Sequence, residues 1–395
     1  MSHVKKITIV LGLLLVLSAF NTSSIANLKS FGFLTLASLL TLSFLLLMFI
    51  LVKKLTIPKI TINILNLSIV MLFLYSLAII IDGFSLRGVT NFVQLFSVFG
   101  FFVCMSFVNW DNVKIYVIGN IVALFIALNY IVFTANKFSF PFKSFAGNEN
   151  VFSALMFYLA FFPILNLMLV KRRFNKMIWF MILAINIVLV IAGHARSIWL
   201  ALLICAFVFM LWNRITSCKV TFYSFFLLVI LALFVVTILY PSLSTHPNAS
   251  LWNQYVRQYT GANLFSGRER LWQPLIELIK QKPLLGYGAS AVPGQFLQTG
   301  LSSHNYYIQM ALQTGLIGLG VIWLLLFNVW KIFYYGKNSV YVRLAGSYFI
   351  SALVYQLFEV SLTQNNLSIG ILIWLIISIG VNKSIEEKSK MRHVN

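Results

Sequence analysis

Long apolar stretches alternate with short polar breaks along almost the whole chain. Most of these stretches come close to the ~20 residues that an α-helix needs to cross the hydrocarbon core of a bilayer. Their apolar residues are continuous and do not alternate with polar ones, which excludes the strand pattern of a transmembrane β-barrel. The pattern predicts about twelve membrane helices, at 7–26, 31–52, 61–81, 89–108, 115–135, 151–170, 177–193, 197–212, 221–240, 305–330, 341–361 and 367–381.

The composition supports the same fold class. Of the 395 residues, 60% are hydrophobic and 9% are charged, and the mean hydropathy is +0.92, whereas a soluble domain has roughly 45–50% apolar and 25% charged residues. A water-soluble globule is therefore excluded, and we expect an all-α polytopic membrane protein in which residues 1–395 form a single integral membrane domain. The three cysteines, Cys104, Cys205 and Cys218, show no C-x-x-C spacing and no cluster with histidine, so neither a disulfide framework nor a metal site is expected.

The chain is strongly basic, with 29 Lys and Arg residues against 8 Asp and Glu and a net charge of +21. A nucleic-acid partner is not expected, because the basic residues form short clusters between apolar runs, as the positive-inside rule produces. With the N-terminus inside, most of them lie on the cytoplasmic side, including K-R-R-F-N-K at 171–176. Both termini are therefore predicted to be cytoplasmic. A cleavable signal peptide ending near 23–26 is an alternative for the first segment that would leave the rest of the topology unchanged.

Two outward loops differ from the other connections: one at 136–150, and a much longer one at 241–304. Long connections without a purpose are uncommon, and such loops often carry function. Within the longer loop, Ser266 and Glu269 have the spacing of a capping box, which predicts the start of a helix. Apolar residues follow at helical spacing, so this helix is expected to be amphipathic and to lie along the membrane surface or over the bundle, with a kink at Pro274.

Arg268 and Arg270 fall in the first turn of that predicted helix. Because free N–H groups and the positive end of the helix dipole lie there, the two arginines predict a phosphate site. The alternative is an amphipathic loop helix whose arginines contact lipid headgroups.

His304 stands at the entrance of the tenth membrane helix, beside Asn305 and Tyr306. An imidazole in such a position can act as a base, an acid or a phosphate ligand at physiological pH. A purely structural role for an interfacial histidine is the alternative.

Two further charged residues are placed near the outer ends of predicted helices. Arg196 lies in G-H-A-R-S at 193–197, where it either snorkels to the headgroups or serves a pocket that faces the bundle interior. Glu359, near the outer end of the eleventh predicted helix, is interpreted as a counter-ion to an arginine or a residue at the water boundary, with a base as the third alternative.

Several kinds of chemistry have no signal in the sequence. No two outward carboxylates are close along the chain, and there is no P-loop and no G-x-S-x-G, so glycosidase, nucleotide-driven and serine-hydrolase chemistry are not indicated. The outward arginines and histidine suit an anionic, phosphorylated, lipid-linked substrate.

Several motifs, taken in their order along the chain, resemble those of a known family. The chain resembles the O-antigen ligase and O-antigen or capsule polymerase superfamily of bacterial membrane glycosyltransferases, over about residues 190–335. The matching motifs are G-H-A-R-S at 193–197, S-G-R-x-R-x-W at 266–272, P-L-L-G-Y-G at 283–288, and His304-Asn305 followed after nine residues by Gly315 and then by Gly318, with F-A-G-N-E-N at 145–150 as a weaker match.

The resemblance implies metal-independent, inverting glycosyl transfer from an undecaprenyl-pyrophosphate-linked glycan, without a cofactor, on the outer face of the bacterial cytoplasmic (inner) membrane. Arg196 and Arg268 resemble the arginines that hold the donor pyrophosphate, and His304 resembles the essential histidine that activates the acceptor hydroxyl or binds phosphate. The remaining substrate-binding candidates are Arg270, Asn305, Glu269 and Tyr306. Where a ligase pattern has R-x3-L, Trp272 stands in place of the leucine.

Three functions remain open. We favour a repeat-unit polymerase, which joins the lipid-linked glycan to a lipid-linked repeat unit. The second is a ligase that transfers the glycan to lipid A core or another surface acceptor. The third is a polysaccharide or lipid transporter, which predicts charged or broken helices near mid-membrane and related halves. The expected partners are the glycan donor, the glycan acceptor and membrane lipids, with a chain-length regulator or a flippase as further candidates.

Overall fold

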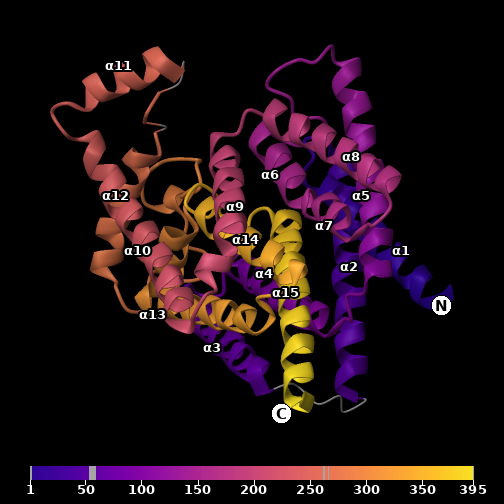
Figure 1. Ribbon diagram of the computed structural model, residues 1–395. Coiled ribbons are helices and arrows are strands. Elements are labelled where there is room, and N and C mark those ends of the chain that lie inside the picture. Colours follow the sequence, from indigo (N-terminus) through magenta and orange to yellow (C-terminus); the bar gives the residue numbers. More distant parts are fainter. Residues whose placement is uncertain (1, 53–58, 261–262, 266, 395) are drawn as a thin grey trace.

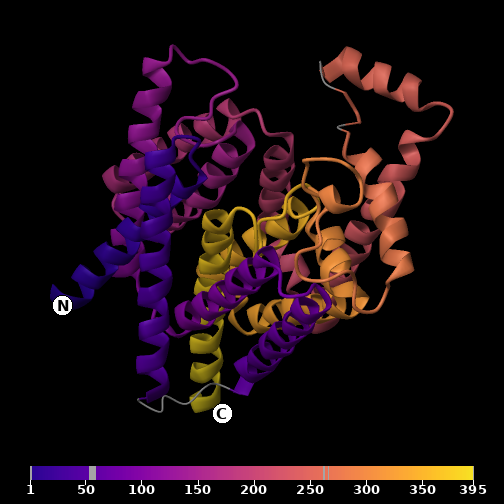
Figure 2. The ribbon, with the colours of Figure 1, turned by 180° about the vertical axis from the view of Figure 1, so that it is seen from behind.

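The computed structural model describes residues 2–394 apart from 53–58, 261–262 and 266. Within this described part, 79% of the structure is helical and no strand occurs. The helices, shown in Figures 1 and 2, are α1 (Ser2–Leu17), η1 (Ser18–Thr22), α2 (Ala26–Val52), α3 (Lys59–Ile81), α4 (Leu86–Phe107), α5 (Asn112–Ala135), α6 (Glu149–Leu159), α7 (Phe161–Leu169), α8 (Arg173–Ala192), α9 (Arg196–Ile215), α10 (Lys219–Ser244), α11 (Ala249–Thr260), α12 (Arg268–Gln281), η2 (Pro293–Gln295), α13 (Tyr306–Phe333), η3 (Tyr334–Gly336), α14 (Val340–Tyr355) and α15 (Leu367–Val394).

Apolar length determines most of these elements. Among the residues that the structure describes, eleven helical segments are long and apolar enough to cross a membrane, and the shorter apolar helix α14 is the twelfth. Each predicted segment coincides with one of them, which confirms the all-α polytopic fold. The sixth is divided at Ala160 into α6 and α7, where Pro163 has no N–H to donate to the carbonyl of Leu159.

The eleventh predicted segment, 341–361, is shorter in the structure, because α14 ends at Tyr355. The side-chain oxygen of Gln356 accepts hydrogen bonds from the N–H groups of Ser361 and Leu362, both at 3.1 Å, and so closes the following residues into a loop. Glu359 therefore lies in a loop and not in a helix, which corrects its predicted position.

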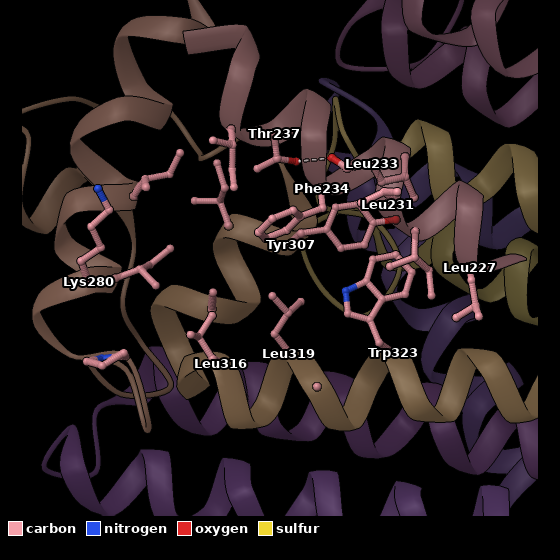
Figure 3. A pocket seen from close by; sticks show the side chains of 18 residues that line it. Leu227, Leu231, Leu233, Phe234, Thr237, Lys280, Tyr307, Leu316, Leu319 and Trp323 are labelled. Atoms are coloured by element: carbon pink, nitrogen blue, oxygen red, sulfur yellow. Dashed lines mark hydrogen bonds between the residues drawn. The ribbon is translucent and has the colours of Figure 1, made fainter. Parts of the chain in front are cut away.

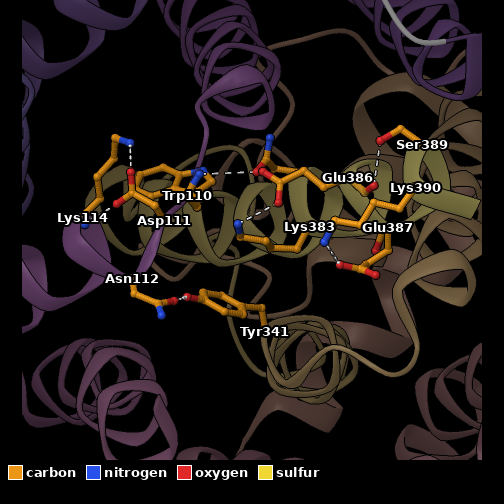
Figure 4. A network of polar contacts seen from close by, with 12 residues as sticks. Trp110, Asp111, Asn112, Lys114, Tyr341, Lys383, Glu386, Glu387, Ser389 and Lys390 are labelled. Atoms are coloured by element: carbon orange, nitrogen blue, oxygen red, sulfur yellow. Dashed lines mark hydrogen bonds and ion pairs between the residues drawn. The ribbon is translucent and has the colours of Figure 1, made fainter. Parts of the chain in front are cut away.

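Contacts at one end of the bundle join the start of α5 and the residues before it to α14 and α15, which are far away in sequence (Figure 4). The N–H of Trp110 donates to Asn382 Oδ1 at 3.4 Å, and the hydroxyl of Tyr341 donates to the Asn112 side chain. Three ion pairs gather at the same end: Lys114–Asp111, Lys383–Glu386 and Lys390–Glu387. The segments that meet here are among those predicted to share the cytoplasmic side, so their packing is consistent with the predicted alternation. We call the opposite end, which carries the loop 241–304, the loop side.

The two C-terminal helices, α14 and α15, form the centre of the bundle (Figures 1 and 2), and the apolar part of α15 is almost entirely buried. Small residues allow this packing. A Cβ atom on Gly346 would lie 2.5 Å from the Trp212 ring, and one on Gly380 would lie 2.6 Å from Ala345 Cβ. Close helix contact at the centre thus depends on the absence of side chains at these positions.

The feature that most directly positions the loop side is a break in α13. Gly315 has φ 67° and ψ −172°, a conformation outside the helical region. The N–H of Leu316, on the far side of the break, donates to the carbonyl of Pro283 at 2.7 Å, while the N–H of Tyr287 donates to the carbonyl of Leu312 at 2.8 Å. The segment 283–288 therefore supplies partners to backbone groups on both sides of the break, and we call this arrangement the backbone splice.

The chain after the splice is fixed to α3 and α4 as well. The N–H of Ala289 donates to the carbonyl of Ala78, and the N–H of Ser290 donates to Asp82 Oδ2, both at 3.1 Å. Asn91 Nδ2 donates to the carbonyl of Ala289 at 2.9 Å. The middle of the long loop is thus part of the packed structure.

Replacement of Gly315 by alanine should destabilise the protein. A Cβ atom there would lie 2.0 Å from the Leu284 carbonyl oxygen, and the positive φ alone should cost about 1–3 kcal/mol. Thermal unfolding of the purified protein in detergent measures this loss. The matched control is Gly100→Ala in α4, where a Cβ atom meets nothing within 4 Å. Equal melting temperatures of the two variants would contradict the importance of the splice.

Candidate active site

The candidate site begins at the start of α12. Gly267, with φ 88°, precedes Arg268, the first residue of the helix. Glu269 is buried: its Oε1 accepts from the N–H of Gly267 at 3.1 Å, and its Oε2 accepts from the hydroxyl of Tyr240 at 3.4 Å. Glu269 therefore stabilises the start of its own helix and attaches it to α10. Ser266, the other half of the predicted capping box, lies outside the described residues.

The amphipathic character predicted for α12 is confirmed, because Leu271, Trp272 and Leu275 are buried. Trp272 Nε1 donates to the carbonyl of Ser303 at 2.9 Å. This bond holds the first turns of α12 against Ser303, the residue that precedes His304. The helix that begins with Arg268 is thereby attached next to His304, although the two are far apart in sequence. The helix continues through Pro274 to Gln281.

His304 and Asn305 divide two tasks at the start of α13. Asn305 is fully buried, and its Oδ1 accepts from the N–H groups of Tyr307 and Ile308 at 2.9 and 3.1 Å, as a helix N-cap does. Its Nδ2 donates to Thr237 Oγ1 in α10 at 3.4 Å. His304 has φ 47° and a side chain that is 30% exposed. Asn305 therefore fixes the start of α13, and with it the backbone next to His304.

Tyr306 is also fully buried. Its N–H donates to the carbonyl of Gln356 at 2.8 Å, and its hydroxyl accepts from Thr363 Oγ1 at 3.3 Å. These contacts attach the beginning of α13 to the loop 356–366. For Asn305, Tyr306 and Glu269, direct substrate binding stays a prediction, since the structure gives all three a supporting role.

The loop 356–366 adds a carboxylate to the site. Glu359 Oε1 lies 3.6 Å from His304 Nδ1, which is ion-pair distance but too long for a hydrogen bond. The side chain of Glu359 is only 13% exposed. Next to it, the guanidinium of Arg268 stands 5.6 Å from the centre of the Phe358 ring, within the range of a cation–π contact. Arg268, His304 and Glu359 thus gather around one short loop.

The other two arginines occupy different surroundings. Arg196, at the first position of α9, is exposed, and its Nη1 donates to the carbonyl of Asn263 at 2.8 Å. It therefore holds the segment that leads into α12. Arg270 is exposed on the outer face of α12. Arg268 and His304 thus lie beside the same short loop, 356–366, whereas Arg196 contacts the long loop from the start of α9.

Sequence reasoning did not select Glu359 as a site residue. The available signal was the high cost of a carboxylate within an apolar run. Its partner His304 is distant in sequence, and the pairing depends on how Gln356 closes the loop. Such a contact cannot be deduced from residue spacing.

A large apolar groove lies beside the site, between α10, α12 and α13 (Figure 3). Its volume is about 740 Å³. The groove is lined mainly by apolar and aromatic side chains, among them Phe234, Leu316, Leu319 and Trp323. Thr237, which accepts the hydrogen bond from Asn305, also lines it. The groove therefore reaches the residues that hold His304 in place.

Together these features define a polytopic membrane protein with a cationic and imidazole-containing site next to an apolar groove. Residues 179–324 match the family model of the O-antigen ligase domain, Wzy_C. This match confirms the resemblance to the O-antigen ligase and polymerase superfamily and supports a membrane glycosyltransferase-like role in polysaccharide assembly. The matched segment contains Arg196, Arg268 and His304, whereas Glu359 lies beyond it. Neither the curated proteins nor the solved structures give a match.

Removal of the Asn305 cap should lower stability. In Asn305→Ala, the start of α13 loses an acceptor for two N–H groups, which should cost about 0.5–2 kcal/mol. Asn305→Ser, which keeps a capping oxygen, should recover most of the loss. Melting temperatures of the purified variants measure both effects. An Asn305→Ala variant as stable as the wild type would contradict the capping role and favour a direct role in binding.

Proposed function

We propose that this protein is a repeat-unit polymerase of O-antigen, capsule or exopolysaccharide assembly. It would transfer an undecaprenyl-pyrophosphate-linked glycan to a lipid-linked repeat unit on the outer face of the bacterial cytoplasmic membrane, with both termini in the cytoplasm. The observation that carries the proposal is the position of Arg268 and His304 together, beside an apolar groove. A lipid-linked pyrophosphate needs cations beside its phosphates and an apolar channel for its tail, and this part of the protein offers both.

The donor pyrophosphate is assigned to the start of α12. Free N–H groups of the first helical turn and the half-buried Arg268 favour an anion there. Arg196 is a second candidate, because it binds the backbone of the chain that leads into this helix. Fixed cations are most effective where charge develops, and in this reaction charge develops on the leaving pyrophosphate. The two arginines would therefore lower the barrier to departure of the donor lipid.

The groove is assigned to the polyisoprenoid tail. A volume of about 740 Å³ suits a portion of a long apolar chain, and the lining is overwhelmingly apolar. The groove lies between α10 and α13 and reaches Thr237, which accepts a hydrogen bond from Asn305. A tail within the groove would therefore bring the attached pyrophosphate toward His304.

His304 is the proposed partner of the acceptor. In an inverting displacement, the acceptor oxygen forms a bond to the anomeric carbon while the bond from that carbon to the phosphate oxygen breaks. The electron pair leaves with the pyrophosphate, and the acceptor proton needs a base. His304 would take this proton, or would bind phosphate and leave the proton to water.

A ligase is the second candidate, and the description of the matched family favours it. It would use the same donor chemistry and a different acceptor, such as lipid A core. The leucine of the ligase pattern is replaced here by Trp272, whose buried indole donates to Ser303. The transporter alternative predicted broken helices, and α13 is broken. The break is filled by backbone hydrogen bonds from 283–288, however, so the observation does not favour transport.

Loss of either central residue should abolish transfer. Arg268→Ala and His304→Ala should each reduce activity by roughly 100-fold or more, because they remove charge stabilisation and the proton acceptor. Arg257→Ala, which changes an exposed arginine on α11, is the matched control and should retain activity. The measurement is the glycan profile of a deletion strain complemented with each variant, resolved into lipid-linked intermediates and surface polymer.

The profile also separates the functions. Accumulation of single lipid-linked repeat units with loss of polymer supports the polymerase. Long lipid-linked chains that never reach an acceptor indicate the ligase instead. An unchanged glycan in both variants would be incompatible with the donor site.

Obstruction of the groove should weaken donor binding. Gly320 lines the groove, and a Cβ atom there meets nothing within 4 Å, so Gly320→Phe should place its ring in the proposed tail path. We expect the KM for a full-length lipid-linked donor to rise roughly tenfold, equivalent to ~1.4 kcal/mol. A donor with a short prenyl tail should be affected far less. Gly100→Phe is the control, and equal KM values for it and Gly320→Phe would contradict the assignment.

A further inference from the structure

His304 faces a carboxylate through one ring nitrogen and leaves the rest of its ring accessible. Nδ1 is buried and has no hydrogen-bond partner among the described residues, and Glu359 Oε1 stands 3.6 Å from it. Yet the histidine side chain as a whole is 30% exposed. Because Nδ1 is buried, the exposed part of the imidazole belongs to the rest of the side chain, which includes Nε2. A shift of about half an ångström would convert the approach at Nδ1 into a hydrogen bond of ordinary length.

The local structure restrains this pair from both ends. The carbonyl of Gln356 accepts from the N–H of Tyr306, two residues after His304, at 2.8 Å. The side chain of the same glutamine closes the loop that carries Glu359. One residue thus joins the backbone next to the imidazole to the loop that holds the carboxylate. This restraint is what a positioning contact requires.

Within the described residues, Arg268 forms no salt bridge with Glu359. Among the described residues, the salt bridge formed by Glu359 is with His304, while Arg268 stands over the ring of Phe358. The buried hydroxyl of Tyr355, from α14, is a further titratable group near Glu359 and Arg268. The carboxylate is therefore available to the imidazole, and the guanidinium stays available to an anionic ligand.

We propose that Glu359 is a positioning residue that holds His304 with the proton on Nδ1, so that Nε2 accepts the proton of the acceptor hydroxyl. The inference rests on the proposed glycosyl transfer and assigns His304 the role of base. A carboxylate at Nδ1 fixes the tautomer with a free electron pair on Nε2 and stabilises the imidazolium formed when the acceptor proton arrives. A phosphate ligand would instead need a proton on Nε2.

The kinetic test uses the full-length protein in nanodiscs with a lipid-linked oligosaccharide donor and acceptor. Glu359→Gln should lower kcat roughly 10- to 1,000-fold and leave the donor KM within about twofold, since the pyrophosphate contacts are intact. Glu277→Gln, at the exposed carboxylate of α12 that pairs with Lys280, is the matched control and should behave as wild type.

A second measurement does not depend on activity. Nitrogen-15 NMR of histidine-labelled protein reports which ring nitrogen carries the proton, and comparison with His304→Ala assigns the signal among the five histidines. We expect an Nδ1–H tautomer in wild type and an altered Nδ1 signal in Glu359→Gln. The inference requires this NMR result whether or not the wild type shows transfer. A wild type without transfer would refute the proposed function alone.

Two outcomes would overturn the inference. One is an Nε2–H tautomer in the wild type, or a signal that does not respond to Glu359→Gln. The other is a variant in which the donor KM rises and kcat stays constant, which would place Glu359 and His304 in donor binding. Melting temperatures confirm that the variants being compared are folded.

Discussion

Backbone N–H and carbonyl groups within a membrane must find hydrogen-bond partners inside the protein, and this constraint governs the break in α13. At Gly315 the helical pattern is interrupted, and the segment 283–288 supplies partners on both sides. The middle of the long loop is therefore drawn into the bundle. The helix α12 ends just before the segment 283–288, and His304 lies just before α13. The position of α12 relative to His304 therefore depends on the backbone splice.

The polar residues around the starts of α12 and α13 fall into two sets. Glu269, Asn305 and Tyr306 are buried, and their polar groups are engaged with helix starts and neighbouring segments. Arg268 and His304 remain partly exposed. Because the buried set satisfies the local backbone, the cation and the imidazole are left for a ligand. This division explains why residues adjacent in sequence differ so strongly in their surroundings.

The helices could be predicted well from sequence, since a run of about 20 apolar residues has few other solutions in a membrane. The amphipathic start of α12 was also predictable from its periodicity. The end of α14 was not, because it depends on the Gln356 side chain, and neither was the approach of Glu359 to His304. The motifs at 283–288 and Gly315 were visible as separate patterns, and only the structure shows that they form one backbone unit. Contacts distant in sequence set the chemistry of the site.

In the proposed function, a phosphorylated polyisoprenoid lies with its tail in the groove between α10 and α13 and its pyrophosphate at Arg268. This arrangement can be tested by photo-crosslinking of the protein in nanodiscs with an undecaprenyl pyrophosphate analogue that carries a diazirine in its tail. We expect labelled peptides from α10 and α13, including Phe234 and Trp323, and competition by unlabelled lipid. Labelling spread evenly over lipid-facing helices such as α2 and α8, without competition, would contradict it.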